Sequence, residues 1–332
     1  MRELYTAVKN ELRCVDFSAI WPGFQPIAFA LVGKDQVYLE EGEIPLGDRF
    51  WANTAIKYEG KPLATWCVDN PKDEDVQMLA SNIVHEMFHA FQNAVWKNDG
   101  ANEFALMSYP DDLTAYRIKA AENRFLAQAY TKNDPVVLAD FISLRKSRAK
   151  LLGDIINEEY LSETGEGTAE YAGLCALAQL NPKKCEKYVN EHHIGKLNNP
   201  GEMLFSVRHM SYFTGAVLCL ALKKLGVNFY HCLNESRAVF DVLEDRDNIS
   251  EAFDKYFAEK KGKFDDFLAD GTTTIEKNAK ITGFDPMNMW RMGDQIFCAH
   301  FINLDGESIA GPVVLDMVAG SEREVGSVVL SG

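Results

Sequence analysis

The sequence predicts an α+β fold in which a long helical region stands between two shorter regions rich in β-strands. From Pro71 to about Asp270, apolar side chains recur at helical spacing, interrupted by residues typical of helix ends. On either side of that region, short runs of β-branched and aromatic residues alternate with Gly, Asp and Pro. We therefore expect an N-terminal β-rich lobe, a mainly helical region and a small β-rich C-terminal segment, at 1–70, 71–270 and 271–332.

The N-terminal lobe is expected to begin with a short helix and to continue as strands. The runs IAFALV at 27–32 and QVYLEE at 36–41 are joined by a Gly-Lys-Asp segment, which predicts a β-hairpin. The run PLATWCV at 62–68 predicts another strand, which ends just before the helical region.

Capping and helix-breaking residues divide the helical region. Asp73 or Asp75 can cap a helix that runs to about Asn98, because Gly100 follows it. Further helices are expected over 111–132, 135–160, 164–180 and 203–225, with two short helices within 231–269.

The composition is that of a globular protein with an acidic surface. The apolar share is 47% and the charged share is 25%, both ordinary for a chain that buries a sizeable core. Lys and Arg together number 34, Asp and Glu number 49, and the net charge is −15. Because such a surface repels phosphate backbones and anionic lipids, we expect neither nucleic acid nor a membrane as a partner.

The cysteines and the N-terminal segment favour a reducing compartment. The seven cysteines are odd in number and contain no C-x-x-C pair, so free thiols are expected instead of disulfides. The first residues, MRELYTAVKNELRC, lack the basic-then-apolar pattern of a secretory signal. No apolar run is long enough to span a membrane, so the cytoplasm is the expected location.

The strongest chemical signal is HEMFH at 85–89, which has the form H-E-x-x-H. On a helix, His85 and His89 lie about 40° apart and one turn apart, so both imidazoles can bind one metal ion. Glu86 flanks the same point and can reach a water bound to the metal. Apolar residues fill most of the remaining helix surface, and polar groups in such a buried helix need partners.

A third metal ligand is expected from a different element. A catalytic zinc usually takes three protein ligands and keeps one position for water. The best candidate is Glu166 in TGEGTAEY at 164–171, where small neighbours would let its helix start approach another helix closely. Glu166 and Glu170 share a helix face, so one can bind the metal while the other accepts the second N–H of a ligand histidine.

Together, HEMFH and GEGTAEY resemble the motifs of the gluzincin zinc metallopeptidases. They are most similar to the aminopeptidase-N-like branch, whose second motif is written N-E-G-x-A-x-Y. The resemblance implies that the helical region is a zincin-like catalytic region that holds one zinc ion. It implies His85, His89 and Glu166 as metal ligands, Glu86 as the general base, and Glu170 behind a ligand histidine.

A third segment agrees with this resemblance. The run YFTGAVL at 212–218 resembles the Y-x-K-G-A helix start of the same branch, where the tyrosine hydroxyl donates to the oxyanion of the tetrahedral intermediate. Tyr212 is therefore expected to be catalytic. His209 shares its helix face and stays an alternative donor, since some gluzincins use a histidine there. A packed tyrosine and a surface histidine are the structural alternative for this pair.

Two departures from the branch shape the expected specificity. The separation between His89 and Glu166 is longer than in the aminopeptidases, so an inserted helical pair is expected between them. The G-x-M-E-N motif that binds a free amino terminus is absent upstream of His85, which favours an endopeptidase or a specialised peptidase over a general aminopeptidase.

The strand at 62–68 is the candidate edge strand that would pair with an extended substrate backbone, or else an ordinary sheet strand.

The expected function is zinc-dependent hydrolysis of a peptide or protein substrate, with Glu86 as general base for a metal-activated water. One alternative is a gluzincin-like protein that binds peptides without cleaving them, and a weaker one is a zinc hydrolase of non-peptide amides. The adjacent His192 and His193 lie in a polar stretch and are expected to be solvated.

Overall fold

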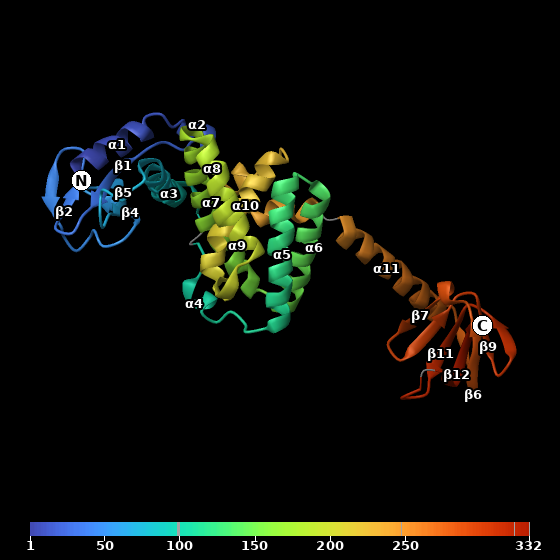
Figure 1. The fold of residues 1–332 in the computed structure, drawn as a ribbon. Coiled ribbons are helices and arrows are strands. Elements are labelled where there is room, and N and C mark those ends of the chain that lie inside the picture. Colours follow the sequence, from blue (N-terminus) through green and yellow to red (C-terminus); the bar gives the residue numbers. More distant parts are fainter. Residues whose placement is uncertain (98–99, 247, 322, 332) are drawn as a thin grey trace. The chain divides into compact units, whose positions relative to one another are not determined.

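The computed structural model describes residues 1–97, 100–246, 248–321 and 323–331. It confirms the α+β class, because long helices and two separate sheets occupy different parts of the chain (Figure 1). The chain divides into two compact units, Met1–Asp247 and Asn248–Gly332. The boundary between the units lies before the last long helix, whereas the sequence predicts it after that helix, between 270 and 271.

The first unit opens with two helices and a five-stranded sheet of order β3-β2-β1-β5-β4. The first two strands form the hairpin that the sequence predicts, with Leu31 opposite Tyr38. The elements are α1 (Arg2–Leu12), α2 (Phe17–Ile20), β1 (Ala28–Val32), β2 (Gln36–Tyr38), β3 (Glu43–Pro45), β4 (Thr54–Tyr58) and β5 (Lys61–Cys67).

The edge of this sheet differs from the expectation. β5, which corresponds to the predicted strand at 62–68, runs parallel to β1 on one side and antiparallel to β4 on the other. It is therefore an interior strand, and β4 is the edge strand. Of the two alternatives for 62–68, the structure has the ordinary sheet strand and not the edge strand, because β1, far earlier in the chain, occupies the other side of β5.

The two faces of β1 belong to two different apolar clusters. Phe29 and Leu31 join the main core, together with apolar residues of α1 and of the next helix, α3 (Val76–Val95). Ala30 and Val32 point to the other face, into a smaller cluster around Phe50. This alternation has the period of two that is typical of a strand, and it leaves one face of the sheet covered by helices.

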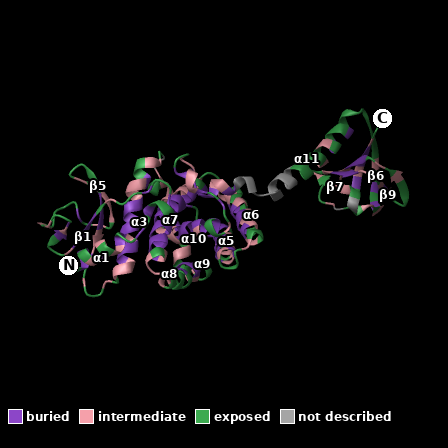
Figure 2. Cartoon of the chain, turned by 90° about the horizontal axis from the view of Figure 1, so that it is seen from above, coloured by how far each residue is buried: buried purple, intermediate pink, exposed green. Residues whose placement is uncertain are grey.

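The rest of the first unit is helical, as expected. Asp75 caps α3 by accepting hydrogen bonds from the backbone N–H groups of Gln77 and Met78. Figure 2 shows that buried residues concentrate on α3, α7 and α10. The further elements are α4 (Glu103–Leu106), α5 (Leu113–Lys132), α6 (Pro135–Leu152), α7 (Ile155–Leu180), α8 (Pro182–Tyr188), η1 (Val189–Ile194), α9 (Gly195–Asn198), η2 (Gly201–Phe205), α10 (Val207–Lys224), η3 (Tyr230–Cys232) and η4 (Phe240–Arg246).

One helix boundary expected from the sequence is wrong. α6 ends at Leu152, and α7 then runs unbroken to Leu180, so Glu166 lies in the middle of a helix instead of at its start. A Cβ atom at Gly167 would lie 2.4 Å from Cα of Gly215 on α10, and one at Gly173 would lie 2.8 Å from the carbonyl oxygen of Ser81 on α3. These glycines therefore mark close helix contacts, and not a helix end.

A buried network of ion pairs joins α5, α6 and α7. Arg145 forms a bidentate pair with Glu163, with N–O distances of 2.5 and 2.9 Å. Arg148 bonds to Glu122 at 2.7 Å and to Glu159 at 2.7 Å. We refer to the three cations and three anions of this cluster as the ion network: Lys119, Glu122, Arg145, Arg148, Glu159 and Glu163. It ties the pair α5 and α6 to the helix that carries Glu166.

The second unit combines one helix with a seven-stranded antiparallel sheet of order β10-β9-β6-β12-β11-β8-β7. Phe264 and Phe267 of the helix pack against Phe297, Val314 and Val329 on one face of the sheet. Where the sequence predicts two short helices within 231–269, the structure has the turns η3 and η4 and one long helix. The elements are α11 (Asn248–Ala269), β6 (Thr272–Phe284), η5 (Pro286–Asn288), β7 (Met289–Met292), β8 (Gln295–Cys298), β9 (Phe301–Leu304), β10 (Glu307–Ala310), β11 (Val313–Met317) and β12 (Glu324–Ser331).

Across the described residues, no helix combines the length and the apolar character that crossing a bilayer requires.

Candidate metal centre

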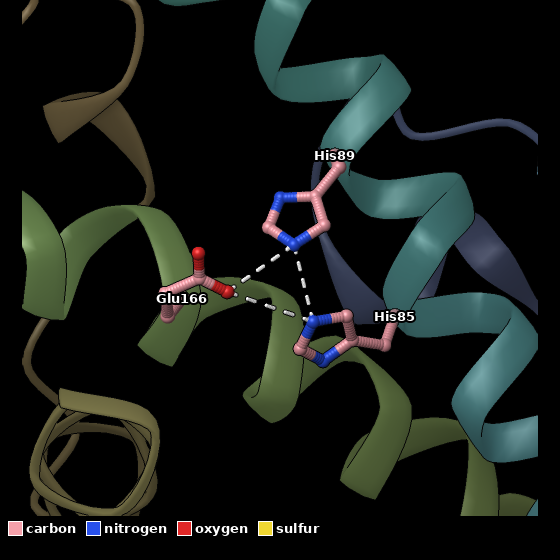
Figure 3. Close-up of side chains that lie close together, drawn as sticks. All are labelled: His85, His89 and Glu166. Atoms are coloured by element: carbon pink, nitrogen blue, oxygen red, sulfur yellow. Dashed lines mark hydrogen bonds and ion pairs between the residues drawn. The ribbon is translucent and has the colours of Figure 1, made fainter. Parts of the chain in front are cut away.

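Three of the predicted ligands converge between α3 and α7 (Figure 3). Nε2 of His85 and Nε2 of His89 are 3.1 Å apart. Oε2 of Glu166 lies 3.4 Å from Nε2 of His89 and 3.9 Å from Nε2 of His85. Ligand atoms about 2.0–2.1 Å from a tetrahedral zinc ion are separated by roughly 3.3 Å, so the three atoms have the spacing of three ligands of one metal ion. We refer to these three candidate ligands as the metal centre.

Glycines and small residues bring the helices of the metal centre together. α7 contacts α3 where the Ser81 hydroxyl donates to the carbonyl oxygen of Gly173 at 2.8 Å. It contacts α10 where a Cβ atom on Gly215 would lie 2.2 Å from the carbonyl oxygen of Glu163. Because a glycine at each contact lets the neighbouring helix approach its backbone, the separation between the helices is fixed closely, and with it the distance between the histidines and Glu166.

The outer nitrogen of each histidine is held by a hydrogen-bond acceptor. Nδ1 of His85 lies 3.1 Å from Oε2 of Glu170, the position that the resemblance implies for that residue. Nδ1 of His89 lies 2.7 Å from Oε1 of Gln92. The Gln92 amide nitrogen donates to the carbonyl oxygen of Gly165 at 2.7 Å, which fixes its oxygen towards His89. Both Nδ1 atoms are therefore donors, and both Nε2 atoms present lone pairs to the metal centre.

The chemistry of these atoms fits a divalent metal ion. Oε2 of Glu166 is buried and has no hydrogen-bond partner among the described residues. It faces two imidazole nitrogens that, with their hydrogens on Nδ1, are also acceptors. Three electron-pair donors at this spacing repel one another unless a positive charge lies between them. Two imidazoles and one carboxylate are the ligand set of many catalytic zinc sites.

Arg208 is a part of the site that the sequence analysis did not identify. Its Nη2 donates to Oε1 of Glu166 at 2.5 Å, and its Nη1 pairs with Glu103 of α4. The guanidinium thus engages one carboxylate oxygen and leaves the other directed towards the histidines. A single arginine one turn before Tyr212 carries no motif, so only the helix arrangement reveals this contact.

The electrostatics of the metal centre favour positive charge. Burial opposes ionisation of Glu166, but His89, Tyr212 and Arg208 outweigh it and lower the pKa of its carboxyl to about 2. Burial opposes a charged His89, but the Glu166 carboxylate outweighs it and raises the pKa of the imidazole. The shifts are opposite because each group stabilises the charged form of the other, and the ionised carboxylate would also attract a metal cation.

Glu86 lies beside the ligands, as expected, and lines the same cavity. The cavity has a volume of about 280 Å³ and is lined by Glu86, the three ligands, Tyr212, Arg208 and residues 53–55 of the edge-strand region. Burial raises the pKa of the Glu86 carboxyl above its ordinary value. A carboxylate with a raised pKa in a cleft next to metal ligands is suited to accept and return a proton near neutral pH.

The structure distinguishes Tyr212 from His209. The Tyr212 ring stacks on the His85 ring with centroids 5.8 Å apart, and the residue lines the cavity. Burial, and then the Glu166 carboxylate, raise the pKa of its hydroxyl. His209 is exposed and bonds to Ser206 at 2.7 Å, and it does not line this cavity. Of the two residues, only Tyr212 lines the cavity.

His193 lies where the sequence analysis did not expect it. It was expected to be solvated together with His192, but the structure buries it, with Nε2 at 3.0 Å from Oε1 of Glu170. The expectation is wrong because residues 182–198 form continuous helical turns that pack on α7, instead of a loop. Only the pair of histidines in the sequence offered a signal.

Two further hollows adjoin the cavity. One, of about 220 Å³, lies between the C-terminal end of α3 and residues 161–166 of α7, and it shares His89, Asn93, Glu166 and Arg208 with the cavity. The other, of about 440 Å³, follows β4 along Ala55, Ile56 and Lys57 and also reaches Asn93. The cleft therefore continues from the metal centre along the edge strand of the sheet.

Comparison with known proteins gives no assignment. No family model, no curated protein and no solved structure matches this chain, so the chemistry of the site has to be inferred from its own residues and distances.

Proposed function

We propose that this protein is a zinc-dependent peptidase of the gluzincin type. The observation that carries the proposal is the convergence of two imidazole lone pairs and a buried carboxylate oxygen, 3.1 to 3.9 Å apart, at the spacing of a tetrahedral zinc site. The resemblance of HEMFH and GEGTAEY to the gluzincin motifs supports the same three ligands, His85, His89 and Glu166.

Two further groups of the cavity have roles in this chemistry. Zinc, when bound, supplies a Lewis acid that polarises a carbonyl oxygen and lowers the pKa of a water ligand towards about 7. Glu86 accepts a proton from water in the cavity and returns it to the leaving nitrogen, a task that its raised pKa favours. Tyr212, kept protonated by its raised pKa, donates to the oxygen that becomes negative, a contribution of roughly 3 kcal/mol.

The substrate that fits the cleft best is an extended peptide. β4 pairs with β5 on one side only, and its residues line the hollows on both sides of Asn93. An edge strand next to a catalytic centre can bind a peptide backbone by strand addition, with little demand on its side chains. Because G-x-M-E-N is absent, we expect internal cleavage in preference to the removal of single amino-terminal residues.

The deciding experiment combines metal analysis with a Glu86→Gln variant. We expect about one zinc per chain in both proteins. The variant should lose a factor of about 10³ or more in kcat/KM for a peptide mixture, because it removes the proton acceptor while keeping the side-chain shape. Glu186→Gln, an exposed acid on α8, is the matched control and should keep full activity.

The outcomes separate the proposal from its alternatives. Wild-type protein without zinc, together with unchanged turnover in Glu86→Gln, would overturn the proposal. Zinc-loaded protein that binds peptides without cleaving them would replace it with the peptide-binding alternative. Cleavage of small non-peptide amides, with no cleavage of peptides, would point to a hydrolase of non-peptide amides. Equal cleavage of a peptide and its N-acetylated form would support internal cleavage over an aminopeptidase.

A further inference from the structure

We infer that His193 is a positioning residue for the metal centre, which acts on the ligand His85 through the carboxylate of Glu170. The inference rests on the proposed zinc site, and it adds an outer member, from a different helical segment, to the residues that hold it.

The inference begins with the two hydrogen bonds of Glu170. Its Oε2 lies 3.1 Å from Nδ1 of His85, and its Oε1 lies 3.0 Å from Nε2 of His193. Each carboxylate oxygen thus has an imidazole partner on a different element, α3 for His85 and η1 for His193. A carboxylate held at both oxygens cannot rotate freely about its last bond, so His193 fixes the orientation of the group that fixes His85.

The burial of His193 indicates that a polar side chain is favourable at this position only because of its hydrogen bond to Glu170. The side chain is 1% exposed, and the rings of Tyr188 and Phe213 lie 5.6 and 5.4 Å from its own. Its Nδ1 is buried without a hydrogen-bond partner among the described residues. Burying an unpartnered ring nitrogen is unfavourable, and an apolar ring would fill the same space without that cost. The favourable contact that remains is the bond to Glu170.

The imidazole partners on both oxygens of Glu170 support the same arrangement. An ionised carboxylate behind a ligand histidine keeps the hydrogen on Nδ1 and makes Nε2 a better electron-pair donor to a metal.

A local distortion of the helix places His193 on the inward side. Residues Pro182–Tyr188 and Gly195–Asn198 are α-helical, but Val189–Ile194 between them form a π-helical turn. This turn exposes His192 and buries its neighbour His193. π-helical turns are rare and are frequently found at functional sites. The two adjacent histidines therefore form a natural pair of test and control positions.

The experiment measures zinc affinity by competition with a chelator in the full chain. His193→Phe keeps a packed ring but removes the donor to Glu170, and we expect about a 10-fold weaker zinc affinity. His193→Gln, whose amide nitrogen can occupy the position of Nε2, should retain most of the zinc affinity that His193→Phe loses. His192→Phe is the matched control and should bind zinc like the wild type. The absorption spectrum of the cobalt-substituted protein should shift in His193→Phe alone.

Action through Glu170 is tested by a double-mutant cycle. Glu170→Ala removes the intermediate group, so His193→Phe in that background should change the zinc affinity by less than about 2-fold. Should His193→Phe fail to fold, as judged by thermal unfolding of the metal-free protein, His193→Asn replaces it, because the shorter side chain cannot reach Glu170.

Two results would overturn the inference: a wild-type zinc affinity in His193→Phe, or an equal loss with and without Glu170. A wild-type protein that binds zinc but cleaves no peptide overturns the proposed function alone, and the affinities then still decide the role of His193. A wild-type protein that binds no zinc overturns both.

Discussion

Two buried polar clusters of the first unit solve the problem of buried charge in different ways. In the ion network, three cationic and three anionic side chains face one another, and its arginines bond directly to carboxylates. In the metal centre, two imidazole nitrogens and Oε2 of Glu166 face one another as acceptors. Arg208 engages only the other oxygen of that carboxylate.

The difference is the one expected between a structural cluster and a cluster that binds a cation, as we propose for the metal centre. A buried charge is tolerated when it is paired and hydrogen-bonded, and both arginines of the ion network meet this condition within the chain. Nζ of Lys119 is paired with Glu159 at 3.0 Å but has no hydrogen bond among the described residues. The metal centre places three electron-pair donors around one point, an arrangement that a cation bound from solution would balance. Both clusters place ionisable groups away from water, but the ion network balances three cations with three anions, whereas the metal centre directs three acceptor atoms at one point.

The largest expected effect is the loss of zinc binding in Glu166→Gln. Replacing an anionic ligand by a neutral amide should weaken zinc binding roughly 10⁴-fold, equivalent to about 5.5 kcal/mol. Chelator competition measures the affinity, with the exposed Glu186→Gln as control. An unchanged zinc affinity in Glu166→Gln would show that the carboxylate of the metal centre does not bind the ion, and the contrast with the ion network would then fail.

The ion network should respond to mutation without any metal. Arg148→Met leaves Glu122 and Glu159 buried beside an apolar side chain, which should lower the free energy of unfolding by roughly 3–5 kcal/mol. Urea unfolding of the metal-free protein measures this change. Arg124→Met, on the exposed face of α5, should stay within about 0.5 kcal/mol of the wild type. A similar loss in both variants would mean that the network is not specifically stabilising.

Zinc should stabilise one unit only. At a free zinc concentration of 100 times Kd, the first unit should gain about 2.7 kcal/mol, because all three ligands lie within Met1–Asp247. Calorimetry with zinc and with a chelator should therefore shift one transition and leave that of Asn248–Gly332 in place. A zinc-dependent shift of the second transition would contradict this, and Glu166→Gln should abolish the shift of the first.

The smallest expected effect is an acid-dependent loss of stability from Glu159. Burial opposes its ionisation, but Arg148 and Lys119 outweigh burial and hold the pKa of its carboxyl well below the ordinary value. A carboxyl with a lowered pKa stabilises the folded state above its unfolded pKa of about 4.3. That stability declines as the pH falls from there towards the folded pKa.

The slope of the stability curve tests this assignment. In the acid range, one proton changes the free energy of unfolding by about 1.4 kcal/mol per pH unit. Urea midpoints measured from neutral pH into the acid range should decline less steeply in Glu159→Gln than in the wild type. Equal slopes would show that Glu159 is not a source of the acid sensitivity.

The local parts of the metal centre follow from the sequence, because they depend on the geometry of single helices. The spacing of His85 and His89 predicts two imidazoles on one face, and the structure has them 3.1 Å apart. The spacing of Glu166 and Glu170 likewise predicts two carboxylates on one face of α7. The peptidase activity itself stays a prediction.

The parts that sequence reasoning missed depend on contacts between distant segments. Gly165 and Gly167 favour a helix end locally, and only the approach of α10 explains why α7 continues through them. Strand order in the sheet is equally non-local, so β5 could not be recognised as an interior strand. Lys119 and Arg148 are charged residues of a type usually found on the exposed face of a helix, yet both are buried because α5, α6 and α7 pack around their partners.

The close contact between Gly167 and Gly215 means that a substitution at either glycine should disrupt the site without changing any of the proposed catalytic groups. A methyl group on either residue has no room, so α7 and α10 would be wedged apart and the carboxylate would move relative to Tyr212. An alanine at either position would then mimic a catalytic lesion in an activity assay, although its origin would be a steric one.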